Sequence, residues 1–238
     1  RREFPAKVLG SDPVTDVGTW TWVKGDDAHG ALPVYGSTGF SDPANTPGSR
    51  YGAVAWRESH GGVWLYGGRG FNATGTEVVF GELWKLVLNN TDPDNPTWDW
   101  AYVAGTQGAY AAPVYASRGV ISFTNQPGSR YRPQAWTTAD DRLCLFGGEV
   151  WSSATATAPA RPADLWCFDV LAWNWLGGTI VDDPVGDYPA VGGRGTPGGR
   201  SAGATWVGEF DTLWLFGGES VDADGDPARR SDLWLITP

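Results

Sequence analysis

Four short motifs recur in the same order, at nearly constant intervals, along the 238-residue chain. They are a Pro-Gly-(Ser/Gly)-Arg turn, an apolar run ending in Gly-Gly, an acid followed by Leu-Trp, and a Trp-x-Trp doublet. The Arg of the turn is Arg50, Arg130 and Arg200, and the second Gly of the apolar run is at positions 68, 148 and 218. The acid is Glu82, Asp164 and Asp232. The doublet stands at 20–22, 98–100 and 173–175. Repetition of this kind predicts a row of similar supersecondary units.

Each motif has the pattern of a β-strand. The run Tyr51–Trp56 and its counterparts are short and apolar, as in strands buried on both faces, and the Gly-Gly motifs end a second such run. The Trp-x-Trp doublets alternate with the period of two that marks a half-buried strand. No segment sustains the period of a helix. We therefore expect an all-β chain whose units are antiparallel meanders of four strands, A to D.

This order of motifs resembles the Kelch repeat, and more closely the long-loop Kelch repeats of secreted proteins. The resemblance covers nearly the whole chain and implies β-propeller blades, a scaffold that serves unrelated functions. The family includes galactose oxidase, whose propeller carries a copper site. Here His29 and His60 are the only histidines, and they fall in connections on opposite faces of the blades, so they cannot readily share a metal. No cofactor is expected.

The motifs divide the chain into about three and a half blades, which together form one propeller segment. Residues 1–25 end a preceding blade, with Phe4–Leu9 as strand C and Thr19–Val23 as strand D. Blades follow at 26–103, 104–176 and 177–238, and the last lacks strand D. Propellers close with about four to eight blades. We therefore expect further blades of the same polypeptide, or another copy, to close the ring. The absence of Met and of a signal-peptide pattern indicates a processed chain or a piece of a longer one.

The long connections point to a binding face. The A–B turns are short, whereas the B–C loops (69–81, 149–163, 219–231) and the D–A connections (24–46, 104–126, 177–196) are long. B–C and D–A connections emerge on the same face of a four-stranded blade, and loops on a rigid scaffold commonly carry binding function. Phe71, Phe80 and Trp151 do not recur and are the candidate binding residues. Tyr35 and Tyr115 sit in a repeated motif, which favours packing.

One Arg and one acid recur in nearly fixed register in every blade. Glu82 follows Arg50 at almost the same separation as Asp164 follows Arg130 and Asp232 follows Arg200. Catalysis needs distinct groups at distinct positions, so identical pairs in each blade favour structural ion pairs over a catalytic site.

Two features indicate an oxidising compartment. Cys144 replaces a Trp of the other blades on strand B, and Cys167 replaces Lys85 or Leu235 on strand C. Because both changes fall in one blade on neighbouring strands, we expect a disulfide, with two buried thiols as the alternative. Asn72-Ala-Thr and Asn89-Asn-Thr are glycosylation sequons in predicted loops.

The acidic run Asp222-Ala-Asp224-Gly-Asp226 allows a calcium site, because hard cations take carboxylate oxygens. The Gly stands fourth and no Glu closes the loop at the twelfth position, so a solvated turn is favoured and no metal is assigned. The net charge of −10 argues against nucleic-acid binding. No apolar run has the length needed for membrane insertion.

These patterns favour an extracellular binding module, of the secretory pathway, that recognises a protein or glycan partner through the B–C and D–A loops. A carbohydrate-active enzyme whose site lies partly in other blades is the alternative from a different class. A structural unit of a larger extracellular assembly is the third hypothesis.

Overall fold

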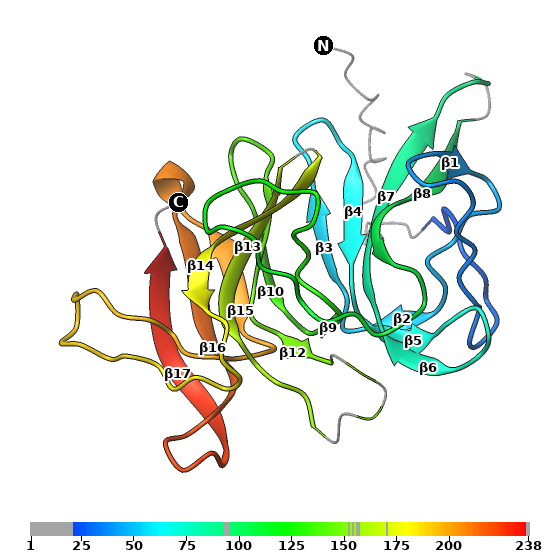
Figure 1. The fold of residues 1–238 in the computed structure, drawn as a ribbon. Coiled ribbons are helices and arrows are strands. Elements are labelled where there is room, and N and C mark those ends of the chain that lie inside the picture. The colour runs from blue at the N-terminus through cyan, green and yellow to red at the C-terminus, as the bar shows by residue number, and fades with distance from the viewer. Residues whose placement is uncertain are drawn as a thin grey trace, which may run out of the picture.

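The structure, a computed structural model, describes residues 21–92, 96–151, 153, 155, 158–169 and 171–236, and it is all-β (Figure 1). The helical content of these residues is one 3-10 turn at Glu209–Asp211. None of them belongs to a helix long and apolar enough to cross a membrane. The predicted strand Phe4–Leu9 and the beginning of the strand predicted at Thr19–Val23 lie outside the described residues.

The described residues form five sheets, and the three main antiparallel ones lie side by side along the chain. The first has the order β1-β8-β7-β4-β3, the second β10-β11-β13-β14 and the third β15-β16-β17. Their strands are β1 (Ser41–Asp42), β3 (Val54–Arg57), β4 (Val63–Tyr66), β7 (Gly81–Asn89), β8 (Thr97–Thr106), β10 (Gln134–Thr137), β11 (Leu143–Phe146), β13 (Ala163–Asp169), β14 (Ala172–Thr179), β15 (Ala204–Val207), β16 (Leu213–Val221) and β17 (Pro227–Ile236). The first two sheets contain the predicted A-to-D meander, and the third ends at its third strand.

The predicted strand A is interrupted. Arg50–Tyr51 forms a separate strand, β2, and the chain turns at Gly52, whose φ is 65°, before β3 begins at Val54. The same turn occurs at Arg132 and Ala202, which also have positive φ. β9 (Arg130–Tyr131) is the counterpart of β2.

The predicted B–C loops contain strands of their own. β2 pairs with β5 (Arg69–Phe71), which forms a hairpin with β6 (Glu77–Val79), and β9 pairs with β12 (Glu149–Val150). In the third sheet β16 and β17 extend into a continuous hairpin. These connections therefore contain more regular secondary structure than the loops that were predicted.

The Trp doublets at 98–100 and 173–175 are not equivalent, contrary to the sequence-based alignment. In the second sheet Trp173 pairs with Phe168 and Trp175 with Trp166. The same places in the first sheet belong to Trp100, opposite Leu86, and Tyr102, opposite Trp84. The alignment was wrong by two positions because a Tyr stands where the second sheet has its second Trp.

The tips of two D–A connections lie along the outer edge of a sheet. β1 pairs with β8, and Asn45 donates from Nδ2 to the Trp100 carbonyl. Asn125 makes the same bond to Trp173. Figure 1 shows β1 beside β8, well away from the hairpin of β5 and β6. The prediction that all long connections gather on one face is therefore wrong for these tips, which cover the exposed edge of the last strand.

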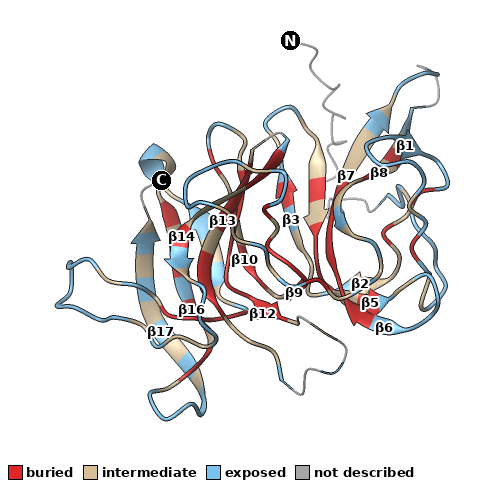
Figure 2. Cartoon of the chain, in the orientation of Figure 1, coloured by how far each residue is buried: buried red, intermediate tan, exposed pale blue. Residues whose placement is uncertain are grey.

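The core lies mainly between neighbouring sheets, where the buried segments concentrate (Figure 2). Trp56 donates from its indole to the Cys144 carbonyl at 3.0 Å, and Trp136 donates to the Trp214 carbonyl at 2.8 Å. The first strand of each of these sheets is thus anchored to the second strand of the next sheet.

Candidate functional site

The three repeated Arg–acid pairs are brought into contact. Arg50 lies 3.1 Å from Glu82, Arg130 lies 2.5 Å from Asp164, and Arg200 lies 2.7 Å from Asp232. Each guanidinium also donates to the first Gly carbonyl of the Gly-Gly motif in its own sheet. Each pair therefore connects the turn before the first strand with the second and third strands.

A Tyr and a Trp complete each pair. Tyr115 and Trp166 both donate to Asp164 at 2.7 Å, and Tyr188 and Trp234 donate to Asp232 at 2.8 and 2.6 Å. Tyr35 and Trp84 donate to Glu82 in the same way. Burial, reinforced by the neighbouring carboxylate, raises the pKa of all three Tyr hydroxyls. Tyr35 and Tyr115 are thus packing residues, as their repetition predicts.

The Cys144–Cys167 disulfide is confirmed. The two residues lie directly opposite each other on β11 and β13, the neighbouring strands that the sequence assigned to B and C. Both are buried in the core cluster shared by the second and third sheets.

The three aromatic binding candidates have different positions. Phe80 is 0% exposed and lies under the Arg50 guanidinium, 3.9 Å from its ring centre, so its assignment to a binding surface was wrong. Phe71 is 41% exposed and Trp151 is half-buried. Phe71 and Trp151 both stand three positions after Gly-Gly, as does Val221, so this is a repeated apolar position and not a unique one.

Side chains that differ between the sheets lie around Glu149 and Glu219, the residues that follow two of the Gly-Gly motifs. We define the Arg132 cluster as Arg132, Glu149, Glu219, Arg161 and Asp183. Arg132 Nη2 donates to Glu149 at 2.7 Å and to Glu219 at 2.6 Å, and Arg161 lies 3.7 Å from Glu149 and 3.5 Å from Asp183. The positions of Glu149 and Glu219 are held by Arg69 in the first sheet, and that of Arg132 by Gly52 and Ala202.

The Arg132 cluster has unmet hydrogen-bonding capacity. Burial disfavours the charge of Arg132, but the bonds to its two glutamates outweigh that effect and raise its pKa. The buried Nε atoms of Arg132 and Arg161 have no hydrogen-bond partner among the described residues. A cluster with unused donors is suited to a ligand that supplies acceptors.

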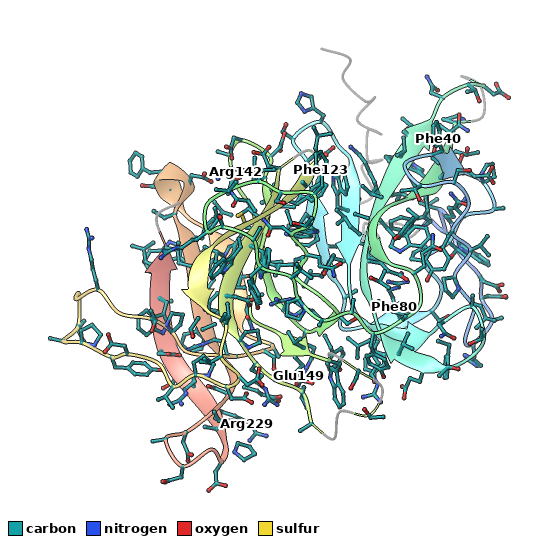
Figure 3. The ribbon with its side chains drawn as sticks, viewed as in Figure 1. Phe40, Phe80, Phe123, Arg142, Glu149 and Arg229 are labelled. Carbon is teal, nitrogen blue, oxygen red and sulfur yellow. A yellow bond between two sulfur atoms is a disulfide. The ribbon has the colours of Figure 1, made fainter. Side chains whose placement is uncertain are left out.

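A cleft of about 160 Å³, whose exposed lining is more polar than apolar, adjoins the cluster. Its lining comes from the second B–C loop and from the two D–A connections beside it: Pro113, Tyr115, Val150, Ala158, Ala160, Pro162, Ile180 and Asp182. Glu149 precedes Val150, Arg161 precedes Pro162 and Asp183 follows Asp182, so the cleft and the charged groups share three backbone segments. In Figure 3 Glu149 lies at the hairpin end of the sheets, and Phe40, Phe123 and Arg142 lie toward the other end.

The acidic run and the Asn72 sequon each form a hairpin turn, and the two turns are of the same type. Asp222 Oδ1 accepts from the amides of Asp224 and Asp226, and Asn72 Oδ1 accepts from those of Thr74 and Thr76. Gly225 and Gly75 have positive φ at matching places, as a three-residue hairpin loop requires. No three His, Cys, Asp or Glu side chains of the described residues are grouped to hold a metal ion, and Asp222, Asp224 and Asp226 are no exception.

Both sequon amides are engaged by neighbours. Asn72 Nδ2 donates to the Gly108 carbonyl at 2.9 Å, and Asn89 Nδ2 donates to Asp99 at 3.0 Å. Asn72 lies in a turn, as predicted, whereas Asn89 is the last residue of β7 and not part of a loop.

Comparison with known proteins leaves the chain without an established family. No family model matches it, and no curated protein does. It is similar to a solved structure titled "Structure of YjhT", with a TM-score of 0.37 and 15% identity over 81% of this chain and 70% of that chain. At this level of similarity the match supports no conclusion about fold or function.

Proposed function

We propose that the chain is a segment of a Kelch-type β-propeller that binds an extracellular partner, a protein or a glycan, at the Arg132 cluster and its cleft. The repeated motifs support the propeller assignment, with the three sheets as successive blades. The carrying observation is that the Arg132 cluster differs from sheet to sheet, while the Arg–acid–Tyr–Trp networks are the same in all three. Distinct side chains at equivalent positions are what recognition requires.

The site offers two kinds of contact. The cleft presents several apolar side chains among exposed polar atoms, and the cluster beside it presents guanidinium donors and carboxylate acceptors. Binding sites commonly combine an apolar cavity with a few polar groups that orient the ligand. A partner with one apolar group next to hydrogen-bond acceptors fits this arrangement, whether that group belongs to a peptide or to the apolar face of a sugar.

The disulfide supports an extracellular location, because cytosolic thiols are kept reduced. Glycosylation at Asn72 or Asn89 belongs to the same proposal. Since both amides are hydrogen-bonded in the folded chain, attachment would take place before these contacts form.

A carbohydrate-active enzyme is the second candidate, because Glu149 and Glu219 are two carboxylates held close together. Both accept from Arg132, which has only donors. Glycoside hydrolysis needs one protonated carboxyl facing the substrate. The observed pairing suits a fixed binding group better than a proton donor.

The test uses the full chain on a glycan array and on a displayed peptide library. Arg132→Gly removes the centre of the cluster, and Gly is the residue that the first sheet has at this place, so folding is preserved. Arg142→Ala, at the other end of the sheets, is the matched control. We expect Arg132→Gly to abolish binding and Arg142→Ala to retain it. Binding unchanged in Arg132→Gly, or no binder in either collection, would refute the proposal.

A further inference from the structure

The third sheet exposes apolar side chains whose equivalents in the other two sheets are buried. Trp206 is 45% exposed, against 3% for Trp56 and 2% for Trp136 at the same place. Leu233 is 55% exposed, against 0% for Leu83. Phe216 and Leu235 are exposed on the same face. Apolar side chains gathered in this way mark a surface that a partner covers.

The ring contacts of the repeated Tyr indicate that the third sheet lacks one aromatic side chain. Tyr35 lies between Trp84 and Tyr102, at ring distances of 5.4 and 5.3 Å. Tyr115 lies between Trp166 and Trp175 in the same way, at 5.0 and 5.1 Å. Tyr188 contacts Trp234 at 5.4 Å, and the described residues supply no ring at the second place. That place belongs to an aromatic residue on a fourth strand.

The chain carries a segment with the features of this fourth strand outside its sheets. Trp22-Val-Lys-Gly25 aligns with Tyr102-Val-Ala-Gly105 and with Trp175-Leu-Gly-Gly178, and each final Gly precedes the repeated Tyr by the same separation. Gly25 has a φ of 113°, close to the 106° of Gly105 and the 91° of Gly178. Trp22 itself is 69% exposed and belongs to no strand.

We infer that Thr21–Val23 of a second copy pairs with β17 and completes the third sheet. The register of the first two sheets places Trp22 opposite Trp234 and Thr21 opposite Leu235. Trp22 then occupies the second place beside Tyr188. Addition of a strand to an open sheet edge is an established mode of protein recognition.

A second copy is the occupant that we propose because the strand that the third sheet lacks has its counterpart in this chain. Three main sheets from each of two copies make six blades, within the usual four to eight. Reciprocal exchange gives a closed dimer with twofold symmetry.

The first sheet has a complementary face. Val63 and Leu65 are only half-buried, whereas Leu143 and Leu145, at the same places in the second sheet, are buried against the first. In the dimer Val63 and Leu65 receive the Trp206 face of the other copy. One contact of the isolated chain, between Lys24 and Asp99 at 3.1 Å, is exchanged on docking. This inference rests on the propeller assignment of the proposed function, but it does not depend on the proposed partner site.

Sedimentation velocity of the full chain tests the dimer. We expect twice the monomer mass for the natural sequence, and association weakened at least about 100-fold by Trp22→Ala, since the change removes an aromatic anchor at both junctions. Trp22→Tyr should keep the dimer, because Tyr102 fills the equivalent place. Phe123→Ala, at an exposed loop tip, is the control. A monomer at every concentration, or a dimer insensitive to Trp22→Ala, overturns the inference.

The register is tested by a cysteine pair. Thr21→Cys combined with Leu235→Cys should give a covalent dimer on a non-reducing gel, because the equivalent residues Asn174 and Cys167 lie directly opposite each other. Thr21→Cys alone should remain without this cross-link. A cross-link within one chain would show that Thr21–Val23 folds back on its own sheet, and absence of any cross-link would show a different occupant. Either result contradicts the exchange.

Discussion

The carboxylate that begins each Leu-Trp motif is the meeting point of three donors, an Arg, a Tyr and a Trp. At Asp164 all of them are half-buried or buried, and the Arg130–Asp164 pair is fully buried. Buried charges of this kind are retained only when every partner is present. We therefore expect the loss of any one partner to remove most of the stability that the whole network contributes.

Removal of one partner tests this. Arg130→Met leaves the Asp164 carboxylate buried without its cation, and we expect a loss of about 3–5 kcal/mol of unfolding free energy. Arg142→Ala, which removes an exposed pair with Asp140, should cost less than about 1 kcal/mol. Urea unfolding monitored by Trp fluorescence gives both values. Equal effects of the two variants would contradict the network.

The third network gives a pH dependence. Burial alone would raise the pKa of Asp232, but hydrogen bonds from Arg200, Trp234 and Tyr188 outweigh it and lower the pKa to about 2. A lowered folded-state pKa stabilises the fold above the unfolded value of about 3.9, and this stabilisation is lost as the pH falls from about 4 to 2. Asp232→Asn should lack this component. Unfolding free energies of both proteins between pH 6 and 2 should converge at the acid end, and parallel curves would refute the assignment.

At the scale of elements, strand pairs and turns explain most of what recurs. β11 and β13 are joined covalently where the first and third sheets have a Trp opposite a Lys or a Leu. The hairpin turns at Asn72 and Asp222 share one geometry although one carries a sequon and the other three carboxylates. Local hydrogen bonding, not the charge of the turn, determines its shape.

Loss of the disulfide should destabilise the second sheet. The cysteines are separated by 23 residues, and a loop of this length constrains the unfolded chain by about 3 kcal/mol. Cys144→Ala/Cys167→Ala should lower the unfolding free energy by about this amount. Addition of a reductant should destabilise the natural protein but leave the variant unchanged, and an effect on the variant would point to another cause.

The turn at Asp222 gives a test of the calcium alternative. Asp222→Ala removes the acceptor of two amide bonds and should cost about 0.5–1 kcal/mol. Asp222→Asn should be nearly neutral, because Asn72 performs the same role in the first sheet. Calcium should not change the melting temperature of the natural protein. Stabilisation by calcium that disappears in Asp222→Asn would restore the metal site.

Repetition explains which features could be predicted from the sequence. The Arg–acid pairs were predicted from the register that all copies share, and the Cys pair from a difference in one copy; the structure places both sets in contact. Phe80 was misassigned because an aromatic residue in a connection gives no sign that an Arg will cover it. The edge position of β1 depends on a pairing between Ser41 and Ala101, which are far apart in the sequence, and no local pattern encodes it. The Arg132 cluster was missed because its members are unlike and were not compared position by position.

At the scale of the whole molecule, the sheets are held together by their first strands. Backbone bonds from Gly68 to Arg130 and from Gly148 to Arg200 connect successive sheets, beside the indoles of Trp56 and Trp136. Each sheet therefore contributes donors to the next one. The third sheet ends this series with Trp206 exposed.

Matched Trp variants measure this coupling. Trp136→Phe keeps an aromatic ring but leaves the buried Trp214 carbonyl without its donor, and we expect a loss of about 1–3 kcal/mol. Trp206→Phe should change the stability of the single chain by less than about 0.5 kcal/mol. Denaturation at concentrations where the protein is monomeric provides the comparison, and a large effect of Trp206→Phe there would contradict the exposed position.

The pairing of β1 with the outer edge of β8 imposes an order on folding during synthesis. The tip at Ser41 leaves the ribosome long before Ala101, the residue with which it pairs. Because synthesis adds about 5–20 residues per second, the nascent tip waits several seconds for its strand. During this interval β7 exposes the edge that β8 later covers, and the growing polypeptide is most vulnerable to off-pathway pairing. Each completed strand β8 or β14 then seals its sheet, so biogenesis proceeds by whole sheets rather than by single strands.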